Sequence, residues 1–294
     1  MGAIVEWNWR QAQVETDGFG APAQFADLAV DALIDEVTLT PKPGLVDFRG
    51  RGAHRDLNWP LMCHSARSLW PTFAELARAG LAGLPQPVLR EQIGAIGRSG
   101  EATMMRATRG VNTHRGAIWA LGLLVTGAAM NPADRSAAAV AARAGALARL
   151  PDRHAPQATG NKGEIACREH AVGGARMQAQ TGFPQVITVA LPTLKHSRIR
   201  GNSENASRLN ALLAVMAELD DTCVLARGGV AGLEAVQRGA AEVLALGGAE
   251  SLAGRRALKA LDSRMLALDV SPGGAADLLA ATLFLDRVES GVLY

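Results

Sequence analysis

AIWALGLLVTGAAM, residues 117–130, is the longest apolar run in the chain. At 14 residues with two glycines, it falls short of the roughly 20 apolar residues that a membrane-spanning helix needs. An apolar run without a polar face is typical of a helix that is buried on all sides. Asn131 and Pro132 then end it. The run therefore predicts a buried helix in a helical, water-soluble protein.

Composition extends this prediction to the whole chain. Alanine, the best helix former and a poor strand former, makes up roughly a fifth of the 294 residues. No alternating strand pattern of useful length is present, and the best candidate, residues 186–191, lies between Pro184 and Pro192. We therefore predict an all-α fold. Residues 22–294 are expected to form a single compact multi-helix domain, and residues 1–21 a loose N-terminal extension.

Apolar positions at helical spacing, bounded by helix breakers, predict the individual helices. They cover approximately residues 22–37, 60–79, 87–96, 113–130, 135–150, 164–180, 204–219, 229–246, 249–268 and 272–288. Ser271 is expected to cap the last of them, with Pro272 at its first position.

Charge and cysteine content exclude several classes of protein. Lys and Arg number 30 and Asp and Glu 28, and a net charge of +2 argues against binding nucleic acid through bulk charge. A hydrophobic fraction of 48% excludes a disordered chain. The three scattered cysteines indicate neither a disulfide framework nor a zinc motif. With no signal peptide visible, we expect a cytoplasmic protein that binds neither nucleic acid nor membrane.

Four polar segments depart from ordinary helix sequence, and each combines glycine with charged or amide side chains: residues 41–56, 106–116, 195–205 and 271–277. In the first, Lys42 supplies positive charge and Gly44 allows close approach of the backbone to a ligand. Asp47, His54 and Asp56 add acids and a base that suit catalysis or metal binding. A solvated surface loop is the alternative explanation for this segment.

Basic residues gather at the start of the apolar helix, where structure alone disfavours them. Arg109, His114 and Arg115 surround this start, and Asn112 or Thr113 can cap it. Helix N-termini attract anions, so cations placed there predict a bound anion. The alternative is a solvent-facing arginine beside a hydrogen-bonded core histidine.

The last segment and two acidic residues complete the candidate site. Gly273 and Gly274 are expected to leave the first-turn amides of the last helix uncovered, which suits a phosphate. Glu36 and Asp277 fall on apolar helix faces, and an inward carboxylate needs a partner or a cation. These features together predict a polyphosphate–Mg²⁺ ligand. The chain has no Walker loop and no dinucleotide-binding GxGxxG.

Several stretches, in one order along the chain, resemble the ATP:dephospho-CoA triphosphoribosyltransferase family. They are Glu36 with PKPGLVD (41–47), GAHRD (52–56), ATRGVNTHRGAIW (107–119), DTCVLARGG (221–229) and SPGGAADLLA (271–280). Arg115 stands where such proteins carry lysine, which keeps the charge. The stretch KHSRIRGNSEN (195–205) resembles the malonate decarboxylase branch more than the citrate lyase branch.

The resemblance implies a pentosyltransferase that joins C1′ of the ATP ribose to the 2′-hydroxyl of 3′-dephospho-CoA and releases adenine. Its product would be the prosthetic-group precursor of the acyl carrier protein of malonate decarboxylase or citrate lyase. A phosphoribosyl-dephospho-CoA transferase acting on that carrier protein would receive it. The sequence is also compatible with a homodimer.

Under this hypothesis the candidate residues divide by role. The catalytic candidates are Glu36, Asp47, His54 and Asp56, with His54 or Asp56 as the general base. The candidates for binding the triphosphate are Lys42, Gly44, Arg109, Asn112, His114, Arg115, Arg227, Gly273 and Gly274. The candidate Mg²⁺ ligands are Glu36, Asp47 and Asp277. The alternatives are an Mg²⁺-dependent hydrolase of ADP-ribose-like nucleotides and a non-catalytic regulator that binds a nucleotide or CoA.

Overall fold

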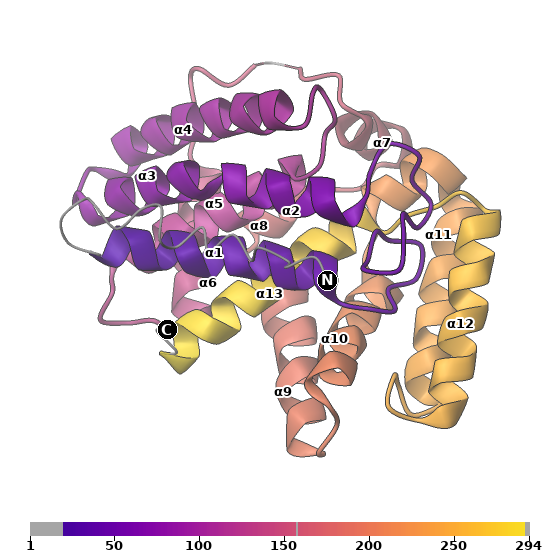
Figure 1. Ribbon diagram of the computed structural model, residues 1–294. Helices are drawn as coiled ribbons and strands as arrows, with labels where there is room; N and C mark the ends of the chain where they lie inside the picture. The colour runs from indigo at the N-terminus through magenta and orange to yellow at the C-terminus, as the bar shows by residue number, and fades with distance from the viewer. Residues whose placement is uncertain (1–19, 157, 292–294) are drawn as a thin grey trace, which may run out of the picture.

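The computed structural model describes residues 20–156 and 158–291, and the regular elements of this part are all helical (Figure 1). The elements are α1 (Ala21–Thr38), α2 (Trp59–Ser68), α3 (Trp70–Leu81), α4 (Gln86–Ala107), α5 (Arg115–Met130), α6 (Ala137–Arg149), α7 (Lys162–His170), α8 (Gly174–Gln180), η2 (Gln185–Ala190), α9 (Leu191–Ile199), α10 (Glu204–Glu218), α11 (Thr222–Ala245), α12 (Leu252–Ala267) and α13 (Gly273–Ser290). The all-α prediction is confirmed. Of the predicted N-terminal extension, residues 1–19 lie outside the described part.

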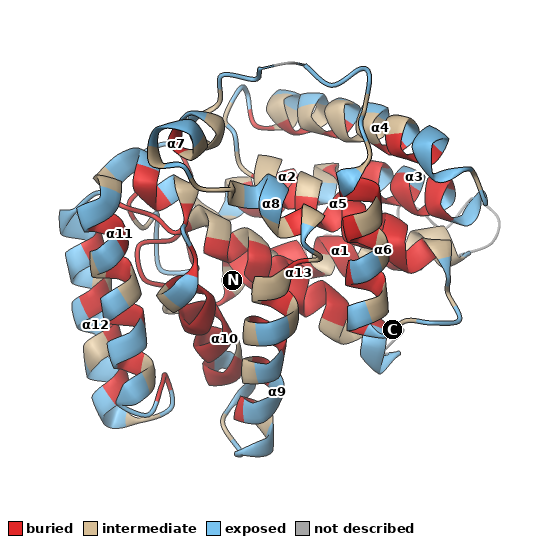
Figure 2. Cartoon of the chain, turned by 180° about the vertical axis from the view of Figure 1, so that it is seen from behind, coloured by how far each residue is buried: buried red, intermediate tan, exposed pale blue. Residues whose placement is uncertain are grey.

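Helix α5 lies at the centre of the core, as its apolar sequence predicts. Nearly every residue from Ala117 to Ala129 is buried, and the helix packs against α3, α6 and α13 (Figure 2). The α3–α5 crossing is close, because a Cβ atom on Gly80 would lie 2.6 Å from the carbonyl oxygen of Thr126. Helix α13 is also apolar on most of its surface and buried over most of its length. These two central helices carry the polar residues of the site at their N-terminal ends.

The structure departs from the predicted helix boundaries in several places, and α9 lies where no helix was predicted. The segment 60–79 divides into α2 and α3 at Leu69, and the segment 164–180 divides into α7 and α8. Helix α4 continues to Ala107, and α11 begins at Thr222, bending at Gly229, whose φ is 59°. The strand candidate at 186–191 is wrong: residues 185–190 form the π-helix η2, which leads directly into α9. In the described residues no strand is present with which it could pair.

Two helical pairs extend from the body that α1, α3, α5 and α13 form. Helices α9 and α10 point away from it together, and α11 and α12 lie side by side at another edge (Figure 1). No helix in residues 20–156 and 158–291 is both long and apolar enough to cross a membrane. The three cysteines, all within the described part, are free thiols.

Candidate active site

A buried ion pair connects α1 to the loop that follows it. Lys42 is 1% exposed, and its ammonium group donates a hydrogen bond to the carboxylate of Glu36, which is also buried. Burial raises the pKa of Glu36 more than the neighbouring Lys42 lowers it. Lys42 was expected to hold phosphate, yet here its charge is balanced by Glu36.

His114 lies at the start of α5 as a buried, neutral side chain. Its Nδ1 atom is 3.0 Å from Ser65 Oγ, and its Nε2 atom is buried without a hydrogen-bond partner among the described residues. Burial, with a smaller contribution from Lys42, lowers the pKa of His114 to about 4. The expectation of a cationic histidine at this helix start is therefore wrong. His114 instead offers an unpaired ring nitrogen.

Asp277 on α13 rests against the first turn of α5. A Cβ atom on Gly116 would lie only 2.0 Å from Asp277 Oδ2, so a side chain at this position would displace the carboxyl group from where it lies. Asp277 keeps some solvent exposure, and no hydrogen bond or ion pair to another described residue engages its carboxyl group. Burial raises the pKa of Asp277 well above its ordinary value, and Glu36 and Asp221 raise it further. The inward acid predicted at this position is therefore present, without a protein cation.

Asp221 caps two helices with one carboxylate. Its oxygens accept hydrogen bonds from the amides of Cys223 in α11 and Ala275 in α13, at 2.8 and 2.9 Å. The Gly274 amide also donates to Asp221, while the Gly273 amide donates to the Ser271 carbonyl. Burial still raises the pKa of Asp221. The prediction that the first-turn amides of α13 are uncovered is wrong, because a protein carboxylate occupies the position expected for phosphate.

These residues define a carboxylate cluster: Glu36, Asp221 and Asp277, with Lys42 as its ammonium partner. Their sequence separations are large, and it is the packing of α1, α5, α11 and α13 that brings them together. Three carboxyl groups face one ammonium, and the raised pKa of each of them shows that the cluster is short of positive charge. An arriving cation would therefore be attracted to it.

His54 joins the loop 41–56 to α11 and to the start of α13. Its Nε2 atom lies 2.9 Å from Ser271 Oγ, and Arg227 Nη2 lies 3.2 Å from its Nδ1 atom. Arg227 also donates to the carbonyl of Ala53 at 2.8 Å. Asp56 Oδ1 is 3.7 Å from His54 Nδ1. Ser271 was expected to cap α13, but its hydroxyl group faces His54 and caps nothing.

Asp47 organises the loop and is not part of the carboxylate cluster. Its oxygens accept hydrogen bonds from Thr40, the amides of Lys42 and Arg49, and the guanidinium group of Arg49. Burial alone would raise the pKa of Asp47, but the hydrogen bonds from Arg49 and Lys42 outweigh it and hold the pKa below its ordinary value. Both oxygens are thus engaged, so Asp47 does not fit its expected roles as metal ligand and catalyst.

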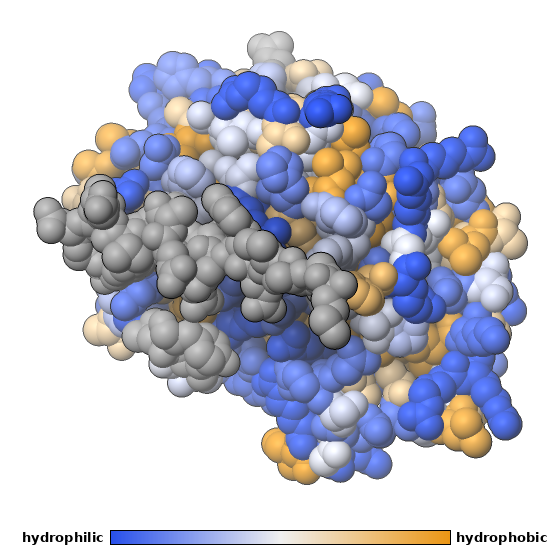
Figure 3. Space-filling view, viewed as in Figure 1, coloured by the Kyte–Doolittle hydropathy of each residue, from blue (hydrophilic) through white to orange (hydrophobic). Residues whose placement is uncertain are grey.

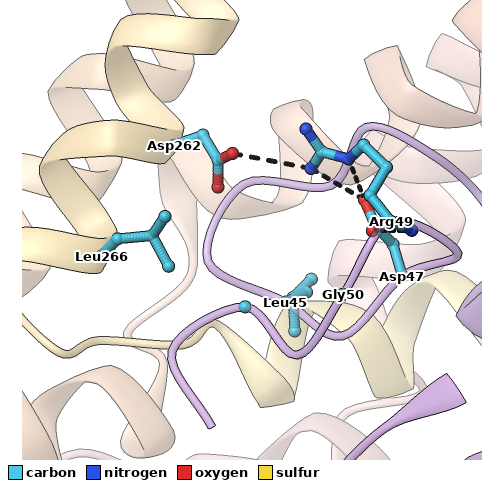
Figure 4. Close-up of a pocket in the computed structure, with 7 residues that line it drawn as sticks. Leu45, Asp47, Arg49, Gly50, Asp262 and Leu266 are labelled. Carbon is cyan, nitrogen blue, oxygen red and sulfur yellow. Dashed lines mark hydrogen bonds and ion pairs between the residues drawn. The ribbon is translucent and has the colours of Figure 1, made fainter.

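A surface hollow of about 220 Å³ lies between this loop and α12 (Figure 4). It is lined by Leu45, Asp47, Arg49, Gly50, Gly52, Asp262 and Leu266. Arg49 reaches across it to Asp262, at 3.5 Å. The Gly44 amide donates to Asp262, and a Cβ atom on Gly44 would lie 2.7 Å from the Val270 carbonyl oxygen. Gly44 therefore serves close packing, and its amide is not free for a ligand.

The remaining basic candidates lie at the start of α5. Arg109 is exposed with a φ of 55°, and Arg115 pairs with Glu101 at 3.1 Å. The Asn112 side chain accepts a hydrogen bond from the Arg115 amide at 3.3 Å, but the N-cap of α5 is His114, so the prediction that Asn112 caps the helix is wrong.

The polar segment 195–205 differs, because most of its charges are paired. Arg198 binds Asp286 through two hydrogen bonds and also Glu204, and Lys195 pairs with Glu289. This segment forms the end of α9, the turn and the start of α10, called here the α9–α10 tip. The surface at this end of the molecule is largely hydrophilic (Figure 3). It contributes no side chain to the carboxylate cluster.

Sequence reasoning missed three residues of the site. Asp221 has the sequence signature of an ordinary helix cap, Gly116 was not singled out, and Ser271 was assigned to the wrong partner. The only available signal was that all three fall inside the stretches that carry the family resemblance.

Comparison with known proteins decides the family. The model of the ATP:dephospho-CoA triphosphoribosyl transferase family matches residues 22–293. The chain belongs to this family. It is therefore an enzyme of the transferase class, as the resemblance implied.

Curated relatives agree with the family match. A 2-(5′′-triphosphoribosyl)-3′-dephosphocoenzyme-A synthase from Klebsiella pneumoniae is 60% identical over 263 residues, 90% of this chain and 94% of the relative. A probable synthase of the same name from Pseudomonas syringae pv. syringae is 59% identical over 270 residues, 90% and 91% of the two chains. Both alignments cover nearly the whole of each protein.

A solved structure shares the fold. The crystal structure of a putative triphosphoribosyl-dephospho-CoA synthase from Archaeoglobus fulgidus superposes with a TM-score of 0.51 at 19% identity. It covers 76% of this chain and 97% of that one. At this identity the likeness concerns the fold alone.

Proposed function

We propose that the protein transfers the 5-triphosphoribosyl group of ATP to the 2′-hydroxyl of 3′-dephospho-CoA and releases adenine. The product is 2′-(5′′-triphosphoribosyl)-3′-dephospho-CoA. The observation that carries the proposal is the carboxylate cluster at the starts of α5 and α13, which is short of positive charge. Because the chain belongs to the transferase family, we interpret this deficit of positive charge as a site for the positive charge of the reaction.

The cluster suits the positive charge that develops in this reaction. Cleavage of the bond between adenine and ribose passes through a transition state with oxocarbenium character, as in glycoside hydrolysis. Carboxylates held beside the ribose stabilise that charge more strongly than the neutral ground state, which lowers the barrier. We assign this role to Asp277 and Glu36, since Asp277 has no protein cation of its own.

The same residues fit a Mg²⁺ ion that arrives with ATP. Within the described residues no three His, Cys, Asp or Glu side chains are grouped so as to hold a metal ion by themselves. Mg²⁺ does not require such a group, because it commonly takes one or two carboxylates together with substrate phosphates and water. Asp277 and Glu36 would be those carboxylates. When bound, the ion neutralises charge on the triphosphate.

The triphosphate is a binding handle, because none of its phosphates is cleaved in this reaction. Arg109 and Arg115 at the start of α5, with the helix dipole, are the groups we assign to it. Contacts to a handle that does not react bind ground state and transition state equally, and they lower KM for ATP. Lys42 contributes indirectly, by fixing the Glu36 carboxylate.

The acceptor hydroxyl group of dephospho-CoA needs a base, and Asp56 is our candidate. Its side chain is 63% exposed and therefore within reach of a substrate. His54 is less suitable, because Arg227 occupies its Nδ1 atom and Ser271 its Nε2 atom. Burial and then Arg227 lower the pKa of His54, against the opposing influence of Asp56 and Asp269.

We further propose that the product serves the malonate decarboxylase pathway in the cytoplasm. A phosphoribosyl-dephospho-CoA transferase would pass it to an acyl carrier protein. The support is the likeness of residues 195–205 to that branch. Deleting the chromosomal gene and measuring growth on malonate and on citrate separates the two branches. Growth on malonate should be lost, and loss of growth on citrate alone would contradict this assignment.

The test of the reaction is incubation with ATP, Mg²⁺ and 3′-dephospho-CoA, followed by mass spectrometry. Free adenine and a triphosphoribosyl adduct in equal amounts are expected. Ribose phosphates without an adduct would favour a hydrolase, and unchanged ATP would favour a regulator. Either result would overturn the proposal.

A further inference from the structure

The contacts of His54 set the direction of a hydrogen-bond relay across the site. An arginine guanidinium has only N–H donors, so Arg227 Nη2 must donate to His54 Nδ1 over their 3.2 Å separation. The neutral ring then carries its hydrogen on Nε2. That hydrogen points to Ser271 Oγ at 2.9 Å, so His54 donates and Ser271 accepts. The relay runs from Arg227 through His54 to Ser271.

This direction is the reverse of that in a hydrolytic triad. Serine, histidine and aspartate in contact would otherwise suggest one, with Asp56 Oδ1 at 3.7 Å from His54 Nδ1. In a triad the histidine Nε2 atom accepts the serine proton and activates the oxygen as a nucleophile. Here Nε2 already carries a hydrogen, because Arg227 occupies Nδ1. Ser271 is therefore a hydrogen-bond donor to something else, and it is not an activated nucleophile.

The Ser271 hydroxyl hydrogen has no acceptor among the described residues. Ser271 is 2% exposed, and a buried donor without an acceptor is unfavourable. Its surroundings are more accessible, since His54 and Gly273 are partly exposed. Asp221 already binds the Gly274 and Ala275 amides, so the Ser271 hydroxyl is the donor left free at the start of α13.

We propose that Ser271 donates its hydroxyl hydrogen to a phosphate oxygen of the bound triphosphate, and that His54 and Arg227 are positioning residues that hold it in this role. The proposal rests on the function proposed above. It replaces the predicted roles of His54 as a base and of Arg227 as a direct ligand of the substrate. A phosphate oxygen is favoured because the free group of Ser271 is a donor, and hydrogen bonds to charged acceptors are stronger than those to neutral ones.

The first test compares Ser271→Ala with Ser263→Ala, a matched change at an exposed serine on α12. A hydrogen bond to the unreacting triphosphate contributes equally to ground state and transition state, so its loss raises KM and leaves kcat unchanged. We expect KM for ATP to rise about tenfold in Ser271→Ala and inhibition by Mg²⁺-tripolyphosphate to weaken equally. KM for dephospho-CoA and inhibition by adenosine should not move.

Unchanged KM for ATP in Ser271→Ala would overturn the proposal, as would a rise confined to dephospho-CoA. If the wild-type enzyme forms no adduct, the proposed function fails instead, and tripolyphosphate binding to the two variants still tests the role of Ser271. These two failures are thus distinguishable.

A second test keeps Ser271 and changes His54. The glutamine side chain in His54→Gln can accept from Arg227 and donate to Ser271, whereas that of His54→Leu can do neither. We expect His54→Gln to keep KM for ATP within about twofold and His54→Leu to raise it about tenfold. Equal values in the two variants would contradict the relay, and this test stands even if Ser271→Ala fails to fold.

The tautomer provides a readout independent of activity. Nitrogen-15 NMR of histidine-labelled protein, with the His54 signals assigned by their loss in His54→Gln, should show hydrogen on Nε2 and none on Nδ1 at neutral pH. Hydrogen on Nδ1 would reverse the relay and overturn the proposal.

Discussion

The carboxylate cluster and the α9–α10 tip look alike in sequence and behave oppositely in the structure. Both combine charged side chains with glycine next to a helix start. At the tip, Arg198 pairs with Asp286 and Glu204, and Lys195 pairs with Glu289, so these charges are balanced within the protein. In the cluster, Asp277 faces Glu36 and Asp221 with no cation of its own. The residue types at a junction therefore say less about binding than whether their charges are already paired.

The largest effect is expected from Asp277→Asn, which removes the unpaired carboxyl group and keeps its shape. We expect turnover to fall about 1,000-fold, because both the developing ribose charge and the Mg²⁺ lose a carboxylate. The free energy of unfolding should stay the same or rise by about 1 kcal/mol, since a buried like charge disappears. Adenine release and denaturant unfolding measure the two effects. Near-normal turnover would show that Asp277 has no catalytic role.

Lys42→Met tests the paired part of the cluster. Glu36 would then be buried without its ammonium partner, and breaking a buried ion pair in this way costs about 3–5 kcal/mol. Urea unfolding of Lys42→Met and of the double variant Lys42→Met/Glu36→Gln measures this loss of stability. The double variant should regain most of the lost stability while remaining inactive. A stable single variant would mean that the ion pair is not formed.

His114, which is influenced by Lys42 of the cluster, makes the stability of the folded protein sensitive to acid. Above pH 6.5 the ring is neutral in both the folded and the unfolded chain. Because its folded pKa is about 4, the unfolded chain alone binds a proton as the pH falls from 6.5 to 4, and stability decreases by about 3 kcal/mol. The difference in the free energy of unfolding between wild type and His114→Gln should change by that amount over this pH range. A constant difference between them would contradict a buried, neutral His114.

The smallest effect is expected at the α9–α10 tip. Arg198→Ala should lower the free energy of unfolding by about 1 kcal/mol, because its ion pairs are half exposed. Its turnover should stay within about twofold of wild type, as expected of charges that are already paired. A large loss of turnover at this distance from the cluster would show that unpaired charge does not mark the site.

Local patterns predicted most of the fold. The apolar run 117–130 identified the buried helix, and proline and glycine placed most helix ends. The missed elements are those decided by tertiary contacts. The π-helical turn at 185–190, rich in β-branched residues, has strand propensity but no neighbouring strand in the described residues. The break between α2 and α3 at Leu69 carries no local signal.

The site was predictable in its members more than in their roles. An acid on an apolar helix face predicted that Glu36 and Asp277 point into the protein, and the structure has them so. Whether a polar group is already satisfied depends on distant residues, and here the local patterns failed. The Gly274 amide is bound by Asp221, and Ser271 faces His54 across 217 positions of sequence. His114 is neutral because of burial, which no spacing rule reveals.

The central claim is that the unpaired carboxylates of the cluster receive ATP together with Mg²⁺. Isothermal titration calorimetry of ATP into wild type and Asp277→Asn, each with excess Mg²⁺ or with a chelator, tests it directly. Wild type should bind ATP at least about tenfold more tightly with Mg²⁺ than without it, and Asp277→Asn should lose most of that difference. The same Mg²⁺ dependence in both proteins would contradict the account.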